Sequence, residues 1–272
     1  MRDCRVSAEL LFCFAILFAI PFAATAAEPL FPQPLHIVRA VDDPVAGRSM
    51  TVEEYYAGNR VVAVSGELVA IADYAAETLT RIDRAGGTFS VVRFADLAAA
   101  RAQLAPERRS AAVSESSTSA PAARGTATHL GRTVELHRVD LAGDSGTVEV
   151  SVDRSIALSS RALEVIAGSA WPAEPTPQAR AILSAAGPSS ALRGIASQSA
   201  RAHGLPVRVR TTFRMGNDSL TVENRVESID SRTAPPALIA VPSGATEVAH
   251  PEVEAARRLR ELDQIAPSSE RR

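Results

Sequence analysis

The stretch that decides the fold runs from Thr51 to Phe94 and reads TVEEYYAGNRVVAVSGELVAIADYAAETLTRIDRAGGTFSVVRF. It consists of short apolar runs separated by residues that are typical of tight turns. Gly58-Asn59 divides the first two runs, and this pair favours a two-residue hairpin because glycine adopts a positive φ at no steric cost. We therefore expect an antiparallel ladder of strands. A helix should follow at 95–104, since Pro106 lies just beyond its end.

A second clear hairpin surrounds Gly216-Asn217, where apolar side chains alternate with polar ones on both sides of the turn. Pairing the two strands across this turn places Phe213 opposite Leu220 on an apolar face and Arg210 opposite Glu223 on a polar face. One apolar face and one solvent-exposed face indicate an antiparallel sheet that covers a core or a cavity on one side. The arginines of the polar face suggest either an anion site or cross-strand ion pairs, and we favour ion pairs.

The rest of the chain yields further expected elements. We expect strands at 36–41, 133–141, 147–153 and 237–241, short helices within 155–202, and a last helix at 251–265. The segment 105–126 consists mainly of Ala, Ser, Arg and Pro, and has few large apolar residues to bury, so it should be a surface insertion or linker.

Residues 1–26 have the layout of a cleaved secretory signal. A weakly positive start precedes a mostly apolar core at Leu10–Phe22, and Ala24-Thr25-Ala26 forms a small-x-small cleavage site. The core is only about 13 residues long, well short of the roughly 20 that a membrane-spanning helix needs. Cys13 follows Phe12 inside that core, which excludes lipid attachment at this cysteine. We therefore expect a periplasmic or secreted protein that is not a lipoprotein and has no integral membrane span after cleavage.

Composition narrows the possible partners. The chain has 29 basic and 31 acidic residues, a net charge of −2, and every basic residue other than histidine is arginine. No global basic field attracts nucleic acid, and the few aromatic residues outside the signal make a base-stacking surface unlikely. Both cysteines, Cys4 and Cys13, leave with the signal, which removes disulfides and thiolate metal sites.

No local motif names a reaction. The five histidines are scattered without the spacing of a metal pair, and the sequence contains no nucleophile elbow, phosphate-binding loop or dinucleotide fingerprint. We therefore predict no catalytic residue, no metal and no cofactor, and a protein that is not an enzyme. A triad assembled from distant residues, as in some hydrolases, stays open at this point.

Four stretches together resemble the LolA-like superfamily, which includes the periplasmic carriers of outer-membrane lipoproteins and related bacterial envelope domains. They are EYYAGNRVVAV (54–64), IADYAAETLTRIDRAGGTFSVVRFADL (71–97), GLPVRVRTTFRMGNDSLTVENRVESI (204–229) and ALIAVPSGATEV (237–248). The sequence departs from the family at two points. Leu238-Ile239 and Ala245 stand where the family usually has aromatic residues around its V-P-x-G segment.

The resemblance implies an α+β fold, in which a strongly curved antiparallel half-barrel has helices covering its concave face. It divides the chain into an N-terminal arm (27–47), a LolA-like domain (48–250) with the 105–126 insertion, and a C-terminal helix and tail (251–272). The carriers hold acyl chains between sheet and helices, and 155–202 would supply the helices here. The residues that would line such a site, unless they simply fill the core, are Trp171, Ile182, Leu183, Leu192, Ile195, Val209 and Phe213.

These observations lead to a functional hypothesis with an alternative. The first hypothesis is an exported envelope protein that acts as a non-enzymatic binding module for a lipid or another apolar ligand. The alternative is an envelope structural or interaction protein with a filled core, which would bind a partner protein through 105–126 or through the last helix.

Overall fold

The computed structural model describes residues 28–43, 47–104, 122–140, 146–169, 204–215 and 218–265. The expected signal segment therefore lies outside the described residues. The strands are β1 (Phe31–Asp43), β2 (Arg48–Gly58), β3 (Arg60–Ser65), β4 (Leu68–Asp73), β5 (Thr78–Asp83), β6 (Thr88–Arg93), β7 (Ala122–His129), β8 (Arg132–Asp140), β9 (Gly146–Asp153), β10 (Leu205–Met215), β11 (Asp218–Asp230) and β12 (Thr246–Glu247). The described helices are α1 (Phe94–Leu104), α2 (Ser160–Ser169), α5 (Pro236–Ile239) and α6 (Pro251–Ile265).

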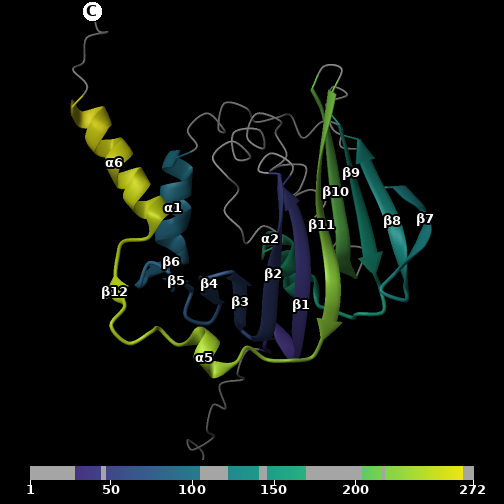
Figure 1. Ribbon diagram of the computed structural model, residues 1–272, viewed down its shortest axis with the longest axis horizontal. Helices are drawn as coiled ribbons and strands as arrows, with labels where there is room; N and C mark the ends of the chain where they lie inside the picture. The colour runs from purple at the N-terminus through teal and green to yellow at the C-terminus, as the bar shows by residue number, and fades with distance from the viewer. Residues whose placement is uncertain are drawn as a thin grey trace, which may run out of the picture.

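All twelve described strands form one open sheet, in the order β12-β6-β5-β4-β3-β2-β1-β11-β10-β9-β8-β7 (Figure 1). Every neighbouring pair is antiparallel except β12 and β6, which run parallel, so the sheet is mixed. The predicted antiparallel half-barrel with helices over its concave face is therefore wrong. The N-terminal and C-terminal ladders of strands are joined edge to edge through β1 and β11. Together they form one wide sheet that does not close.

The helices also differ from the prediction, because two of the four described helices lie beside the sheet and not on its face. Helices α1 and α6 pack against each other beyond the β6 edge (Figure 1). Two hydrogen bonds from Arg101 to Glu252, 2.7 and 2.9 Å long, join them. Helix α5 belongs to the connection between β11 and β12. Helix α2 packs on one face of the sheet, and the single turn of α5 lies on the opposite face.

Strand β2 is buried on both faces, and this divides the core in two. Tyr55 and Tyr56 are sequence neighbours in a strand, so their side chains point to opposite faces. Tyr56 packs in a cluster that includes Ala162 and Ile166 of α2, and we call this side the helix face. Tyr55 belongs to a second cluster, which is covered by the connection at residues 231–245. We call this connection the strap and its side the strap face.

The centre of the sheet holds a fully buried ion pair on the helix face. Arg39 of β1 is 1% exposed and Glu54 of β2 is 0% exposed. Arg39 Nε donates to Glu54 Oε2 at 2.6 Å, and Arg39 Nη1 donates to the carbonyl of Pro206 in β10 at 3.3 Å. Tyr56 Oη donates to the same Glu54 oxygen at 2.9 Å. Burial opposes the charge of Arg39, but Glu54 and Tyr56 outweigh it and raise the pKa of Arg39.

The hairpins predicted from the sequence are confirmed with their registers. Phe213 lies opposite Leu220, and Arg210 lies opposite Glu223. The short strand expected at 36–41 is longer and central, since β1 lies between β2 and β11. The prediction of a strand at 237–241 is wrong. The Pro235-Pro236 pair begins the short helix α5 instead, because proline fits the first helical turn, where an amide hydrogen is not needed.

We predict that removing one member of the buried pair is costly. Glu54→Ala should lower the free energy of unfolding by about 3–5 kcal/mol, because it leaves the Arg39 guanidinium buried without its counterion. The double variant Arg39→Met with Glu54→Leu should recover most of this loss, since apolar residues of similar volume replace the pair. Urea denaturation measures both effects. An unchanged midpoint in Glu54→Ala would contradict the central role of the pair.

The matched control is an exposed ion pair. Arg257 contacts Glu261 on the outer surface of α6, and both side chains are more than half exposed. Exposed pairs gain little because water screens the charges. Glu261→Ala, which removes this exposed contact and leaves the contact of Arg257 with Glu254 in place, should therefore leave the urea midpoint unchanged.

Candidate functional site

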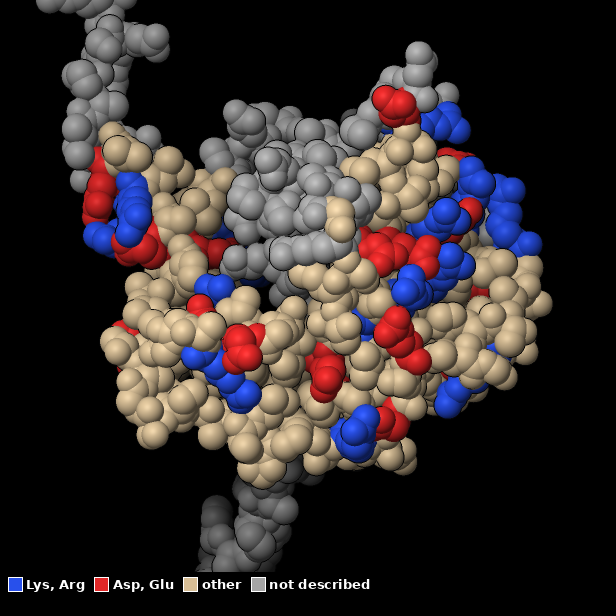
Figure 2. Space-filling view, viewed as in Figure 1, with Lys and Arg blue, Asp and Glu red and all other residues tan. Residues whose placement is uncertain are grey.

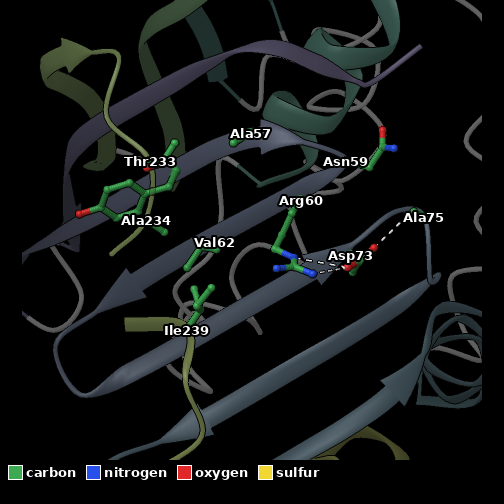
Figure 3. A pocket seen from close by; sticks show the side chains of 10 residues that line it. Ala57, Asn59, Arg60, Val62, Asp73, Ala75, Thr233, Ala234 and Ile239 are labelled. Carbon is green, nitrogen blue, oxygen red and sulfur yellow. Dashed lines mark hydrogen bonds and ion pairs between the residues drawn. The ribbon is translucent and has the colours of Figure 1, made fainter. Parts of the chain in front are cut away.

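A groove lies on the strap face, between strands β2 to β4 and the strap (Figure 3). Its volume is about 330 Å³. The lining is mainly apolar with a few polar groups: Tyr55, Ala57, Asn59, Arg60, Val62, Asp73, Ala75, Thr233, Ala234 and Ile239. Figure 3 shows Ile239 of the strap beside Val62 of β3, with Arg60 paired to Asp73 farther along. The groove forms because the strap crosses the face of the sheet instead of pairing with its edge as a further strand.

The polar end of the groove is an ion pair between paired strands. Arg60 lies opposite Asp73 in the β3–β4 ladder. Arg60 Nη2 donates to Asp73 Oδ2 at 2.8 Å, and Arg60 Nε donates to the same oxygen at 3.3 Å. Asp73 Oδ1 also accepts the amides of Ala75 and Ala76 at 3.1 and 3.0 Å, as aspartate does at the start of many turns. The hydrogen bonds from Arg60 and from these amides lower the pKa of Asp73.

Asn59 ties the hairpin loops together at this end. Its side-chain oxygen accepts the amide of Leu30 at 3.0 Å, and its carbonyl accepts the amide of Tyr74 at 2.8 Å. The Gly58-Asn59 turn, which predicts the hairpin, therefore also fixes the rim of the groove.

Tyr55 and its neighbours form a polar cluster beside the groove. Tyr55 Oη donates to Glu53 Oε2 at 2.8 Å, and the Tyr55 ring stacks on the His36 imidazole with 4.3 Å between centroids. Burial, followed by the hydrogen bond to Glu53, raises the pKa of Tyr55 to about 12. The phenol therefore stays protonated at neutral pH and presents a neutral aromatic surface to the groove.

The same cluster fixes the first residues of the strap. His36 is 1% exposed, and its Nδ1 lies 3.1 Å from Asp230 Oδ2 and 3.2 Å from Arg232 Nη2. Arg232 donates to Asp230 through Nη2 at 2.7 Å, through Nε at 3.0 Å, and through its backbone amide at 3.0 Å. The side-chain hydrogen bond from Arg232 is the main reason that the pKa of Asp230 lies well below its usual range.

The groove is arranged for recognition more than for proton transfer. Among the residues that the structure describes, the lining contains no histidine, cysteine or serine. Asp73, whose pKa is lowered by its hydrogen bonds, stays ionised and is a poor general acid or base near neutral pH. What the lining offers a ligand is an apolar surface, a neutral phenol ring, the Thr233 hydroxyl and one compensated ion pair.

Two of the ligand-lining residues predicted from the sequence lie in the described structure. Phe213 is buried, and Val209 packs with it in a cluster that also contains Val148, Val150 and Val152 of β9. These two residues are therefore side chains of a core cluster. The other five predicted residues, Trp171, Ile182, Leu183, Leu192 and Ile195, lie outside the described residues.

The arginine row of β10 forms the expected cross-strand ion pairs. Arg208 Nη2 lies 2.8 Å from Glu223 Oε2, and Arg210 Nε lies 3.9 Å from the same oxygen. Arg225 in turn lies 3.3 Å from Asp42. Figure 2 shows basic and acidic side chains interleaved over this part of the surface. The row is thus a compensated outer face, in agreement with the favoured interpretation.

Sequence reasoning did not identify the groove. Tyr55, Arg60 and Asp73 lie in the stretch that predicts the ladder, and the Asp73 turn was a visible signal. The strap residues Thr233, Ala234 and Ile239 carry no such signal, because nothing local shows that 231–245 returns across the sheet.

The described residues contain no group of three or more His, Cys, Asp or Glu side chains that could hold a metal ion. No described helix is both long enough and apolar enough to cross a bilayer.

Comparison with known proteins gives no family. No protein-family model and no curated protein matches the chain. Solved structures that match include PNGF-II in the C2 space group, at 10% sequence identity and a TM-score of 0.36. That match covers 83% of this chain and 33% of the other, so the chain spans about a third of its length. This similarity is too low to carry an argument, and the resemblance to the LolA-like superfamily stays a prediction.

We predict that Tyr55 ionises late in an alkaline titration. Its pKa is raised to about 12 by burial and by the hydrogen bond to Glu53, so the protonated phenol stabilises the fold fully below the ordinary tyrosine pKa near 10. This contribution is lost as the pH rises from about 10 to about 12. Tyrosinate absorbance should show a step near pH 12 that Tyr55→Phe removes and Tyr74→Phe leaves in place. Persistence of that step in Tyr55→Phe would contradict the assigned contacts.

Proposed function

We propose that this protein is an exported, non-enzymatic binding module that holds a small amphipathic molecule in the strap-face groove. The observation that carries the proposal is the groove itself, whose mainly apolar lining has Asn59, Arg60 and Asp73 toward one end and Thr233 beside Ala234 toward the other (Figure 3). Ligand sites in proteins have this composition, in which apolar surface supplies affinity and a few polar groups fix orientation.

The size of the groove limits the ligand. A volume of about 330 Å³ is near the lower end of the range for small-molecule sites, roughly 300–1,000 Å³. The groove is therefore suited to one short acyl or alkyl chain, or to a compact ring system. Its open side leaves room for a longer molecule to extend into solvent.

The polar end favours a head group without net charge. Arg60 and Asp73 already neutralise each other at 2.8 Å, so an added anion would meet Asp73 and an added cation would meet Arg60. An alcohol or an amide can accept a hydrogen bond from the guanidinium and donate one to the carboxylate. We therefore expect a neutral hydrogen-bonding group at this end and an apolar body along Val62 and Ile239.

Three ligands with the same chain test this function. In protein-observed NMR titrations, 1-octanol should shift the resonances of groove residues and bind at least about tenfold more tightly than octanoate or octylammonium. A tenfold difference corresponds to about 1.4 kcal/mol, the scale of one neutral hydrogen bond. Equal affinity for the three head groups would contradict the assigned polar end, and shifts confined to other parts of the chain would contradict the site.

A matched pair of variants separates groove binding from adsorption to the surface. Ala57 lines the groove, and Ala57→Trp should abolish octanol binding because the indole fills the space. Ala98 is exposed on α1 and takes no part in the groove, so Ala98→Trp should bind octanol like the unchanged protein. If both variants bind octanol equally well, the ligand does not occupy the groove.

A further inference from the structure

The strap is held to the sheet at separate points and is shallowly buried between them. No residue from 231 to 249 is fully buried, although the strap supplies part of the groove lining. Ala234, Leu238 and Ile239 are half-buried against the strap-face cluster. Segments with few buried contacts open locally at a low free-energy cost, while the rest of the domain stays folded.

The first attachment is a charged cluster at the end of β11. Asp230 accepts two side-chain nitrogens and one backbone amide from Arg232, and the buried His36 ring contacts both residues. Asp230 is also the last residue of β11, which pairs with the central strand β1. This end of the strap therefore continues directly from a strand that pairs with β1 at the centre of the sheet.

The second attachment depends on one side chain. Arg84 Nη2 donates to the carbonyl of Ala237 at 3.0 Å and to the carbonyl of Leu238 at 2.8 Å. These carbonyls belong to the single turn of α5, whose residues are all exposed or half-buried. Arg84 itself stands in a well-held turn between β5 and β6, since its amide donates to the carbonyl of Glu67 at 3.0 Å.

The third attachment is a short parallel ladder at the edge of the sheet. Thr246 and Val248 donate their amides to the carbonyls of Gly87 and Phe89, at 2.9 and 2.7 Å. Between α5 and this ladder, Gly244 adopts a φ of +83°, a conformation that side-chain-bearing residues rarely adopt. The backbone therefore changes direction at Gly244, between the Arg84 attachment and β12.

We propose that the strap is a gate for the groove, with a fixed end at Asp230–Arg232 and a releasable catch at Arg84. The inference rests on the proposed function, because it describes how a ligand enters and leaves that site. When the two Arg84 hydrogen bonds break, α5 lifts and takes Ile239 away from Val62, which opens the groove along its length. When they re-form, Ala234 and Ile239 close over the ligand.

Hydrogen exchange measured by mass spectrometry tests the catch without any ligand. The reporting amides are those of Leu238 and Ala240, which donate to the carbonyls of Pro235 and Pro236 within α5. In Arg84→Ala these amides should exchange about tenfold faster, because two hydrogen bonds from a charged donor are lost. Arg93→Ala, in which an exposed arginine of the neighbouring strand β6 is removed, should leave their exchange unchanged.

Two results would overturn the gate. One is an unchanged exchange rate at Leu238 and Ala240 in Arg84→Ala. The other is an equal acceleration in β3 and β4, since this would show general unfolding instead of local opening.

The same variants with 1-octanol separate the gate from the proposed function. If both hold, octanol slows strap exchange in the unchanged protein, and Arg84→Ala raises the octanol dissociation rate about tenfold in NMR exchange measurements. If Arg84→Ala accelerates strap exchange locally but octanol does not bind, the mobile strap stands and the function as proposed fails. If octanol binds the groove and leaves it at the same rate in both proteins, the function stands and the gate is overturned.

Discussion

The structure depends on the buried pair of Arg39 and Glu54. A charge in an apolar interior is tolerated only where a counterion and hydrogen bonds compensate it. Here the compensation comes from three strands, since Arg39 on β1 contacts Glu54 on β2 and the Pro206 carbonyl on β10. The Arg39–Glu54 contact needs only the pairing of β1 with β2. The hydrogen bond to Pro206 forms only when the C-terminal strands also lie beside β1, and it therefore favours this arrangement of the sheet over others that would bury similar apolar area.

This constraint also produces the groove. Once β2 is held beside β1, Tyr56 points to the helix face and Tyr55 to the strap face, so β2 needs a cover on both sides. Helix α2 covers one side closely, with Ala162 and Ile166 fully buried. The strap covers the other side loosely, because a connection with four prolines or glycines among its fifteen residues cannot pack like a regular helix. The space it leaves is the candidate binding site.

The sequence predicted the local ladders and did not predict how they combine. Gly58-Asn59 and Gly216-Asn217 specify tight hairpins, and the alternation around them fixes register, so Phe213 faces Leu220 as expected. The pairing of β1 with β11 joins residues as far apart as His36 and Asp230, 194 positions away, and no local pattern reports it. An arginine and a glutamate in apolar strands look like surface residues until both are seen to share one interior. The apolar run Ala237–Val241 in the strap predicts a strand, because its composition is that of a strand.

We propose that a small amphipathic ligand lies between the strap and strands β2 to β4. The most direct measurement is the set of nuclear Overhauser effects between bound 1-octanol and the protein methyl groups. We expect contacts from the alkyl chain to the methyl groups of both Val62 of β3 and Ile239 of the strap, which both line the groove. Contacts only to residues of the helix face, such as Leu163 of α2, with none to Val62 or Ile239, would contradict the account.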